Sequence, residues 1–262
     1  MAAAGRTRAT GGATTGENGP VKKSKTAILL ARDIVRAIYE NKLKPGDRYF
    51  SEEEALRRHG VARNTLREAL RYLEFQGALE IRPGPGGGAV VAQPDWTHLA
   101  STLALLLQFA NAPLRSVFEA RVAIDPGMAE LAARNAGADD LARLDDALAQ
   151  VEANLGDYRK FHQAYMRFWD HLAASTGNAI LALLTPSMRR IIHSAVFVPT
   201  EPSRADLLVR LRRIRDAVAR HDEPGARLAT SEFDSDLLAR LTKAYPRQLE
   251  GVVAWSDVDL NP

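Results

Sequence analysis

The chain has 262 residues, 46% of them hydrophobic, so it is long enough for two domains with buried cores. It contains no cysteine, which excludes disulfides, thiolate zinc sites and cysteine nucleophiles. Its formal net charge is +3, and the basic excess lies in residues 1–95, which carry 16 Lys and Arg against 11 Asp and Glu, while the remainder carries 19 against 21. A basic N-terminal part suits a domain that faces a polyanion, and the lack of cysteine fits a cytoplasmic protein.

Residues 1–22 are rich in Gly, Ala and Thr, lack the apolar run of a secretory signal and are expected to form a disordered arm. The stretch SKTAILLARDIVRAIYENKL then places apolar side chains at helical spacing, which predicts a first helix with Ser24 as its N-cap. In SEEEALRRHG, Ser51 and Glu54 have the spacing of a capping box, and Gly60 is a stop. The sequence therefore predicts two helices before residue 61.

A third helix is predicted in ARNTLREALRYLEFQG, where Leu66, Leu70 and Leu73 form an apolar stripe. The polar side chains at the edge of this stripe or outside it are Arg63, Asn64, Thr65, Arg67 and Arg71. The segment ALEIRPGPGGGAVV then alternates like a strand, breaks at a Gly and Pro cluster and resumes as a strand. Three helices and a hairpin predict a winged helix-turn-helix over residues 23–93.

The third helix of such a module enters a DNA major groove, where arginines bind guanine edges or phosphates and Asn or Thr side chains form hydrogen bonds. For each single arginine the alternative is a solvated helix surface. A phosphate-binding loop is a weaker interpretation of GPGGG, because the Gly-Lys-Ser/Thr ending is absent.

The segment LKPGDRYFSEEEALRRHGVARNTLREALRYLEFQGALEIRPGPGGGAVV resembles the GntR-type winged helix over nearly its whole length. The resemblance implies that Arg63, Asn64, Thr65 and Arg67 occupy the family's DNA-reading positions and that Gly86 lies near the wing tip, at the minor groove. Two positions depart from the family pattern: Glu53 stands where a basic residue is usual, and Ala62 replaces a capping Ser or Thr. The missing cap costs on the order of 1 kcal/mol of helix stability.

After a linker at 94–98, the pattern predicts an all-α bundle over residues 99–245 and a tail over 246–262 without clear periodicity. The helices are expected at 96–110, 113–134, 138–154, 157–175, 178–194, 203–221 and 223–243. The charge-poor stretch WTHLASTLALLLQFANAPL is shorter than a membrane span and is expected to be a buried helix, so no membrane partner is predicted. The fold class is thus mainly α, with an N-terminal winged helix-turn-helix and a C-terminal helical bundle.

This second half resembles the FadR-type (FCD) ligand-binding domain, on the segments VFEARVAIDPGMAELAARNA, FWDHLAASTGNAIL and RIRDAVARHDEPGARLA. Some members of that family hold a metal through one Asp and three His. By their spacing, the four ligand positions fall here on Tyr165, Trp169, Leu211 and Phe233, which are poor ligands for a divalent metal. No metal site and no cofactor are therefore expected.

The segment DYRKFHQAYMRFWDHLAASTGN contains two histidines and two aspartates, so a metal site there has to be considered without reference to any family. At 100° per residue, His162 and His171 point in opposite directions and cannot share one ion within this helix. His171 falls on the polar face with Asp157, and His162 borders an aromatic face that is core or the wall of a pocket.

A pocket wall requires polar groups that orient a ligand. The resemblance implies that Arg121 faces the ligand, and an ion pair with Asp125 at the surface is the alternative; Asn178 is either a pocket donor or an N-cap. The predicted effector-binding residues are Arg121, Tyr165, Trp169, Asn178, Leu211 and Phe233.

The leading hypothesis is a homodimeric transcriptional regulator, a repressor, that binds an inverted repeat and is released by a hydrophobic effector such as a fatty acid, an acyl-CoA or another apolar carboxylate. One alternative is a metal-dependent sensor of small carboxylates with relocated ligands, such as His162 and His193. Another is a helical half that serves only dimerisation. An enzyme is not expected, because no Ser–His or metal–water constellation has a recognisable spacing.

Overall fold

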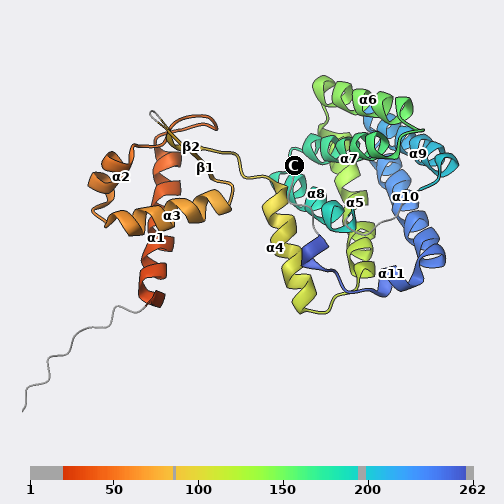
Figure 1. The fold of residues 1–262 in the computed structure, drawn as a ribbon. Coiled ribbons are helices and arrows are strands. Elements are labelled where there is room, and N and C mark those ends of the chain that lie inside the picture. The colour runs from red at the N-terminus through yellow and green to blue at the C-terminus, as the bar shows by residue number, and fades with distance from the viewer. Residues whose placement is uncertain (1–19, 85–86, 194–198, 258–262) are drawn as a thin grey trace, which may run out of the picture. The chain divides into compact units, whose positions relative to one another are not determined.

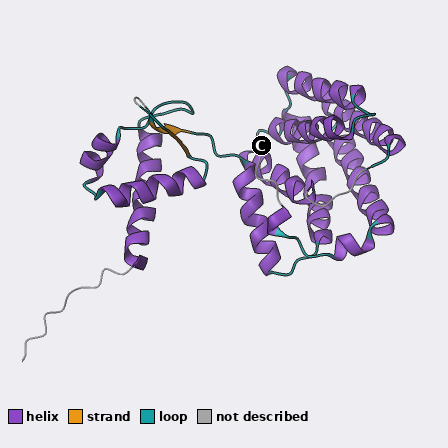
Figure 2. Ribbon diagram, in the orientation of Figure 1, coloured by secondary structure: helices purple, strands orange, loops and turns teal. Residues whose placement is uncertain are grey.

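The computed structural model describes residues 20–84, 87–193 and 199–257, and it divides between Pro94 and Asp95 into two compact units (Figure 1). Helices dominate both units, and the described residues contain one sheet, with two strands (Figure 2). The expected fold class, a winged helix-turn-helix followed by an all-α bundle, is confirmed.

The first unit contains α1 (Pro20–Glu40), α2 (Glu52–His59), α3 (Arg63–Phe75), β1 (Leu79–Arg82) and β2 (Gly88–Val91). Helix α1 packs across α3, and the core between the helices and the sheet includes Ile34, Leu66 and Leu73. The strands are antiparallel, with Leu79 opposite Val91. The apolar stripe predicted for the third helix is therefore the face that this helix buries.

The ends of the first two helices test the capping predictions. Ser51 Oγ accepts from Glu54 N at 3.3 Å, and Ser51 N donates to Glu54 Oε2 at 2.9 Å, so the predicted capping box is present. Gly60 ends α2 in the left-handed region, with φ 61°. The prediction for Ser24 was wrong: α1 begins at Pro20, because proline is well suited to the first position of a helix, and Ser24 lies inside the helix.

The second unit is a helical bundle. Its elements are α4 (Trp96–Phe109), α5 (Leu114–Asn135), α6 (Ala138–Ala153), α7 (Tyr158–Ser175), α8 (Ala179–His193), α9 (Glu201–Ala219), α10 (Glu223–Ala244), α11 (Pro246–Glu250) and the 3-10 helix η1 (Trp255–Asp257). Helix α5 lies against α10 along much of its length, and α6 lies against α7 (Figure 1). The seven predicted helices are all present, with ends shifted by at most two residues.

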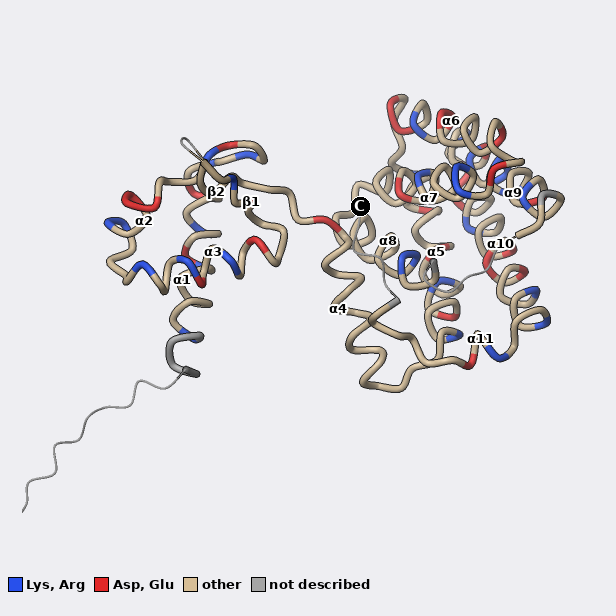
Figure 3. The backbone as a smooth tube through the Cα atoms, viewed as in Figure 1, with Lys and Arg blue, Asp and Glu red and all other residues tan. Residues whose placement is uncertain are grey.

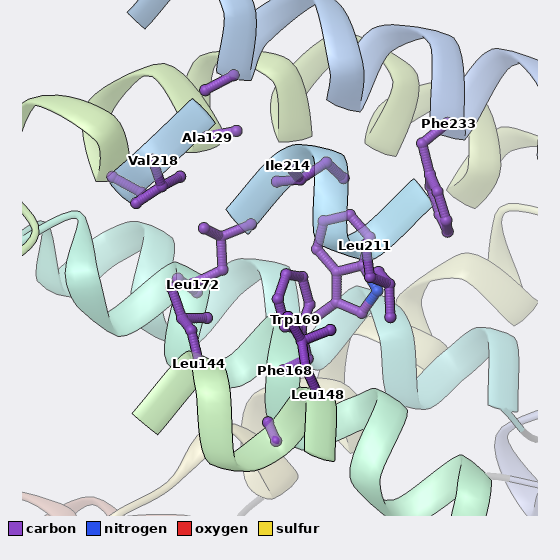
Figure 4. Close-up of a cluster of buried hydrophobic side chains, with 14 of the residues drawn as sticks. Ala129, Leu144, Leu148, Phe168, Trp169, Leu172, Leu211, Ile214, Val218 and Phe233 are labelled. Atoms are coloured by element: carbon purple, nitrogen blue, oxygen red, sulfur yellow. The ribbon is translucent and has the colours of Figure 1, made fainter. Parts of the chain in front are cut away.

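The largest buried cluster of this unit joins α5, α6, α7, α9 and α10. Trp169, Leu211 and Phe233 belong to it and are fully buried or nearly so (Figure 4). Tyr165 packs against this cluster. The four positions that the resemblance predicts as metal ligands are therefore brought together by this fold, and they carry aromatic and aliphatic side chains.

The tail shows no clear periodicity in the sequence, yet its described residues pack against the bundle. Leu249 and Val253 are buried, Leu114 N donates to Gly251 O at 2.9 Å, and Val253 N donates to Ala112 O at 3.1 Å. The side chain of Trp255 donates from Nε1 to Ser101 Oγ at 2.8 Å. These contacts join residues far apart in the sequence, so the local periodicity of the sequence could not predict them.

Helix α4 was expected to be buried, and this is only partly correct. Ala100 and Ala104 are fully buried, but Leu106 and Phe109 are 62% and 82% exposed. Nowhere in the described ranges is a helix both long and apolar enough to cross a bilayer. The exposed apolar face of α4 therefore needs another explanation.

Candidate functional site

The predicted DNA-reading residues lie on the outer side of α3. The buried side of α3 is formed by Leu66, Ala69 and Leu73. The opposite side of the helix therefore faces solvent. Arg63, Asn64, Arg67 and Arg71 are exposed, and Thr65 is half-buried. The structure thus places these residues along one accessible helix surface, as the module requires.

The first turn of α3 has no side-chain cap. Ala62 occupies the N-cap and makes no side-chain hydrogen bond, as its identity predicts, so the helix keeps amide donors available there. Arg67 Nε lies 3.6 Å from Glu52 Oε1, an exposed ion pair between α3 and α2. The sequence did not reveal this pair, which holds one of the arginines predicted to read DNA on a carboxylate.

The wing is the hairpin of β1 and β2, where Arg82 lies opposite Gly88. Gly86, the residue expected near the wing tip, lies outside the described residues. The adjacent Gly87 is required by its surroundings, because a Cβ at this position would lie 2.2 Å from Arg82 O. Gly88 has a φ of 126°, a conformation that L side chains rarely adopt.

The second candidate site is a cavity of about 320 Å³ in the bundle, between α5, α7, α8, α9 and α10. Its wall includes the rings of Phe118, Tyr158, Phe161, His162, Tyr165 and Phe233. The side chains of Arg121 and Arg189 also line it. The cavity therefore has the composition of a small-molecule site, with a mostly apolar wall and few buried polar groups.

The structure brings only part of the predicted effector set to this cavity. Arg121, Tyr165 and Phe233 line it, whereas Trp169 and Leu211 lie behind its wall in the buried core. Asn178 does not line it.

Asn178 is exposed and caps α8: Ile180 N and Leu181 N donate to Asn178 Oδ1 at 2.9 and 3.3 Å. Of the two alternatives for this residue, the N-cap is the one observed.

Four buried charges meet at one end of the cavity. Arg121 Nε donates to Asp125 Oδ2 at 3.0 Å, and Arg121 Nη2 donates to Asp234 Oδ1 at 2.7 Å. Arg189 Nη2 donates to the same Asp125 Oδ2 at 2.5 Å. The pair of Arg121 with Asp125 is therefore buried, not the surface pair that the sequence left open. We call these four residues the charge cluster.

The charge cluster contains two arginines and two aspartates, but the pKa values of these groups are shifted differently by their surroundings. Burial lowers the pKa of Arg121, but Asp234 and Asp125 outweigh it and raise that pKa. Burial and the neighbouring Arg121 lower the pKa of Arg189. Burial raises the pKa of Asp234 to about 6, with Arg121 opposing and Asp125 reinforcing the shift. Arg189 is thus the less well compensated of the two cations.

The cavity also has a charged border. Arg210 donates from Nε to Asp206 at 3.1 Å and from Nη1 to Asp236 at 2.7 Å, and Arg240 Nη1 lies 2.9 Å from Asp206. All four residues line the cavity. Because these cations are matched by carboxylates that are partly exposed, the border attracts an anion less than a buried, incompletely paired arginine does.

Metal binding finds little support in the part of the chain that the structure describes, where no three His, Asp or Glu side chains form a group that could hold an ion. His162 lies in the cavity wall between the rings of Tyr158 and Tyr165, with centroids 5.8 and 6.2 Å away. The side chain of His193, its partner in the relocated-ligand alternative, lies outside the described residues.

Arg189 and Asp234 are the residues of this site that sequence reasoning missed. Arg189 stands next to a second arginine in SMRRIIH, and Asp234 stands in a helix rich in acidic residues, so neither is distinguished locally. Their partners lie 64 and 113 residues away. Only the fold identifies them.

Two family models match the chain: that of bacterial regulatory proteins of the gntR family over residues 29–90, and that of the FCD domain over residues 116–235. The first covers α3 and the wing, and the second covers the charge cluster and most of the cavity wall.

Two curated regulators resemble the chain over nearly their whole length. The HTH-type transcriptional regulator Mce2R of Mycobacterium tuberculosis is 27% identical over 87% of this chain and 98% of its own. The galactonate operon transcriptional repressor of Escherichia coli is 26% identical over 84% of this chain and 96% of its own.

Among solved structures, a GntR protein of Streptococcus agalactiae has the same fold, with a TM-score of 0.66 and 24% identity over 81% of this chain and 99% of its own. Neither the matched families nor the curated relatives named above are enzymes. The chain carries a gntR-family DNA-binding domain followed by an FCD domain, and it is a DNA-binding transcriptional regulator of that type.

Proposed function

We propose that this regulator is a repressor of the FadR subfamily that binds an inverted-repeat operator as a homodimer and leaves it when a hydrophobic effector with a carboxylate enters the metal-free cavity. The effector class comprises fatty acids, acyl-CoA thioesters and similar apolar acids. The observation that carries the proposal is the cavity itself, whose wall combines aromatic and imidazole rings with two buried arginines.

The exposed face of α4 supports the homodimer. Leu99, Leu106 and Phe109 recur at helical spacing and are 39%, 62% and 82% exposed. No charged residue interrupts this helix, which is drawn entirely in tan in Figure 3. A contiguous apolar stripe of this kind is typical of an interface, and a second copy of the chain gives the two-fold symmetry that an inverted repeat requires.

The sign of regulation and the effector rest on different arguments. The similar galactonate operon regulator of E. coli is a repressor by name, which favours the same sign here. An effector changes DNA binding only through its different affinity for two arrangements of the dimer. A ligand in contact with α5, α8 and α10 at once is placed to favour one arrangement of these helices.

The test begins with selection of duplexes from a random pool by the purified full-length protein. We expect an enriched inverted repeat with half-sites about one helical turn apart, and release of that duplex by a graded series of apolar monocarboxylic acids. Alanine at both Arg63 and Arg67 should abolish enrichment, whereas Arg36→Ala, at an exposed arginine on α1, should not. Failure of every acid to release the selected duplex would refute the effector proposal.

A further inference from the structure

The segment before α2 forms a third edge of the wing. Arg48 makes an antiparallel bridge with Val90, on the side of β2 that β1 does not occupy. Next to this bridge, Tyr49 N donates to Ala89 O at 2.8 Å. Strand β2 is therefore the middle of three paired segments, and the backbone that carries Arg48 is held in place by the hairpin.

The pairing puts Arg48 on the outer face of the wing. Residues directly opposite each other lie on the same face of a sheet, and this face recurs at every second residue. Arg48 and Glu80 both lie opposite Val90, and Arg82 lies opposite Gly88, two residues earlier in β2. The side chains of Arg48, Glu80 and Arg82 are exposed, so this face presents two cations and one anion to solvent.

The two arginines of this face differ in their partners. Arg82 Nη2 donates to Glu80 Oε2 at 2.9 Å, whereas Arg48 forms no ion pair or side-chain hydrogen bond with any residue of the described ranges. A Cβ at Gly88 would lie 3.8 Å from both Nε and Nη2 of Arg48. The guanidinium of Arg48 thus lies over backbone that has no side chain, with its donors uncommitted.

The first turn of α2 is close both to Arg48 and to α3. Hydrogen bonds with Ser51 lower the pKa of Glu54, and the positive charge of Arg48 adds a smaller lowering. Glu52, in the same turn, pairs with Arg67 of α3. The outer face of the wing and the helix surface predicted to read DNA therefore border the same turn.

We infer that Arg48 binds a backbone phosphate of duplex DNA at the wing and that Gly88, which has no side chain, leaves room for the sugar–phosphate chain to approach. A guanidinium matches a phosphate with parallel hydrogen bonds, and such a contact positions a protein on DNA without reading its sequence. This inference rests on the DNA-binding part of the proposed function and adds a residue outside α3 and the wing tip.

The experiment measures fluorescence anisotropy of the full-length protein with two labelled duplexes of equal length, the selected operator and an unrelated sequence, over a series of salt concentrations. We expect Arg48→Gln to weaken binding to both duplexes by a similar factor, about three- to tenfold at low salt. The slope of log K against log salt concentration should become smaller by about 0.9 for each bound protomer, because one phosphate contact is lost.

Arg36→Gln is the matched control. Arg36 is an exposed arginine on α1 that pairs with Asp33 at 3.3 Å, so its replacement removes the same charge from the same unit. We expect this variant to change either affinity by less than about twofold and to keep the salt slope of the wild type.

Arg48→Lys is the second variant in case glutamine disturbs the wing. Lysine keeps the charge but lacks the planar fork, so we expect the salt slope of the wild type and a loss of affinity of about two- to threefold. Circular dichroism of each variant compares its helix content and thermal unfolding with those of the wild type.

Two results would overturn the inference. In the first, Arg48→Gln binds both duplexes as Arg36→Gln does. In the second, it loses affinity for the operator alone, which means that Arg48 reads bases instead of binding a phosphate. Binding to the unrelated duplex can be measured even if no inverted repeat is selected, and release by an apolar acid, the other part of the proposed function, can fail whatever Arg48 does.

Discussion

Glu52 and Arg67 form an ion pair on the surface that we propose for DNA binding. Binding a phosphate or a guanine through Arg67 requires this arginine to leave Glu52, which lies 3.6 Å away. Both side chains are largely exposed, so the pair is worth at most about 1 kcal/mol. Its removal is nevertheless measurable in DNA binding, because it frees a cation and removes an anion near the phosphates.

We therefore predict that Glu52→Gln tightens operator binding by about two- to fivefold at low salt, with a smaller gain as ionic strength rises. Fluorescence anisotropy with a labelled duplex at two salt concentrations measures this. Glu40→Gln, at an exposed position at the end of α1, is the control and should change affinity less. Weaker binding by the Glu52 variant would mean that the carboxylate positions Arg67 for the duplex.

Asp234 gives the cavity a dependence on pH. It is surrounded by Arg121 and Asp125 on α5, Arg189 on α8 and Tyr165 on α7, and α9 contributes leucines to the same core. Burial raises the pKa of Asp234 to about 6, so its carboxylate forms only as pH rises through that value. The charge cluster therefore becomes more negative as pH rises through that value.

At the level of single residues, the sequence predicted what depends on local geometry. The exposure of Arg63 and Arg67 follows from the leucine stripe of their own helix. Asn178 was predicted as an effector-binding residue, and the cap observed instead was the alternative that its position before a helix left open. Arg189 and Asp234 escaped prediction because their roles depend on partners brought together by the fold.

At the level of elements, α5, α8 and α10 are joined by the charge cluster. Asp125 is fully buried and accepts from both Arg121 and Arg189. Removing it leaves two buried guanidinium groups with one carboxylate between them, and an uncompensated buried charge is strongly destabilising. Asp125 is thus the centre on which the packing of three helices depends.

Asp125→Ala should lower the free energy of unfolding of the helical unit by about 3–5 kcal/mol. Denaturant titration followed by circular dichroism measures the change, and Asp146→Ala, at an exposed position on α6, should stay within about 0.5 kcal/mol of the wild type. A similarly small loss for the Asp125 variant would show that the arginines find other partners or water.

The helices of both units were predictable because their signals are local. Ser51 and Gly60 mark the two ends of α2 by short-range hydrogen bonds or backbone conformation, and both are found there. Asp157 and Asp222 cap α7 and α10 in the structure by hydrogen bonds that are equally local. The segment after residue 245 was not predictable in the same way, because α11 and η1 are held by contacts with α4 and with the α4–α5 junction, far away in the sequence.

At the level of the whole molecule, the apolar stripe on α4 predicts the oligomeric state. If Leu106 and Phe109 lie in the homodimer interface, glutamate at both positions should shift the full-length protein from a dimer towards a 28.7 kDa monomer in sedimentation experiments. It should also weaken binding to the inverted repeat far more than binding to a single half-site.

Leu228→Glu is the control, since Leu228 is 58% exposed on α10, outside the stripe. A double glutamate variant that sediments like the wild type would place the dimer interface elsewhere and leave the α4 surface without an explanation.

The stacking of Arg189 on Trp169 has an experimental consequence. The indole ring lies 3.9 Å from a positive charge, so the energy of its excited state depends on how that charge is compensated. An arriving carboxylate changes this compensation without touching the ring. The emission spectrum of Trp169, isolated by replacing Trp96 and Trp255 with phenylalanine, should therefore report occupancy directly, and screening compound libraries for the natural signal molecule requires no added dye.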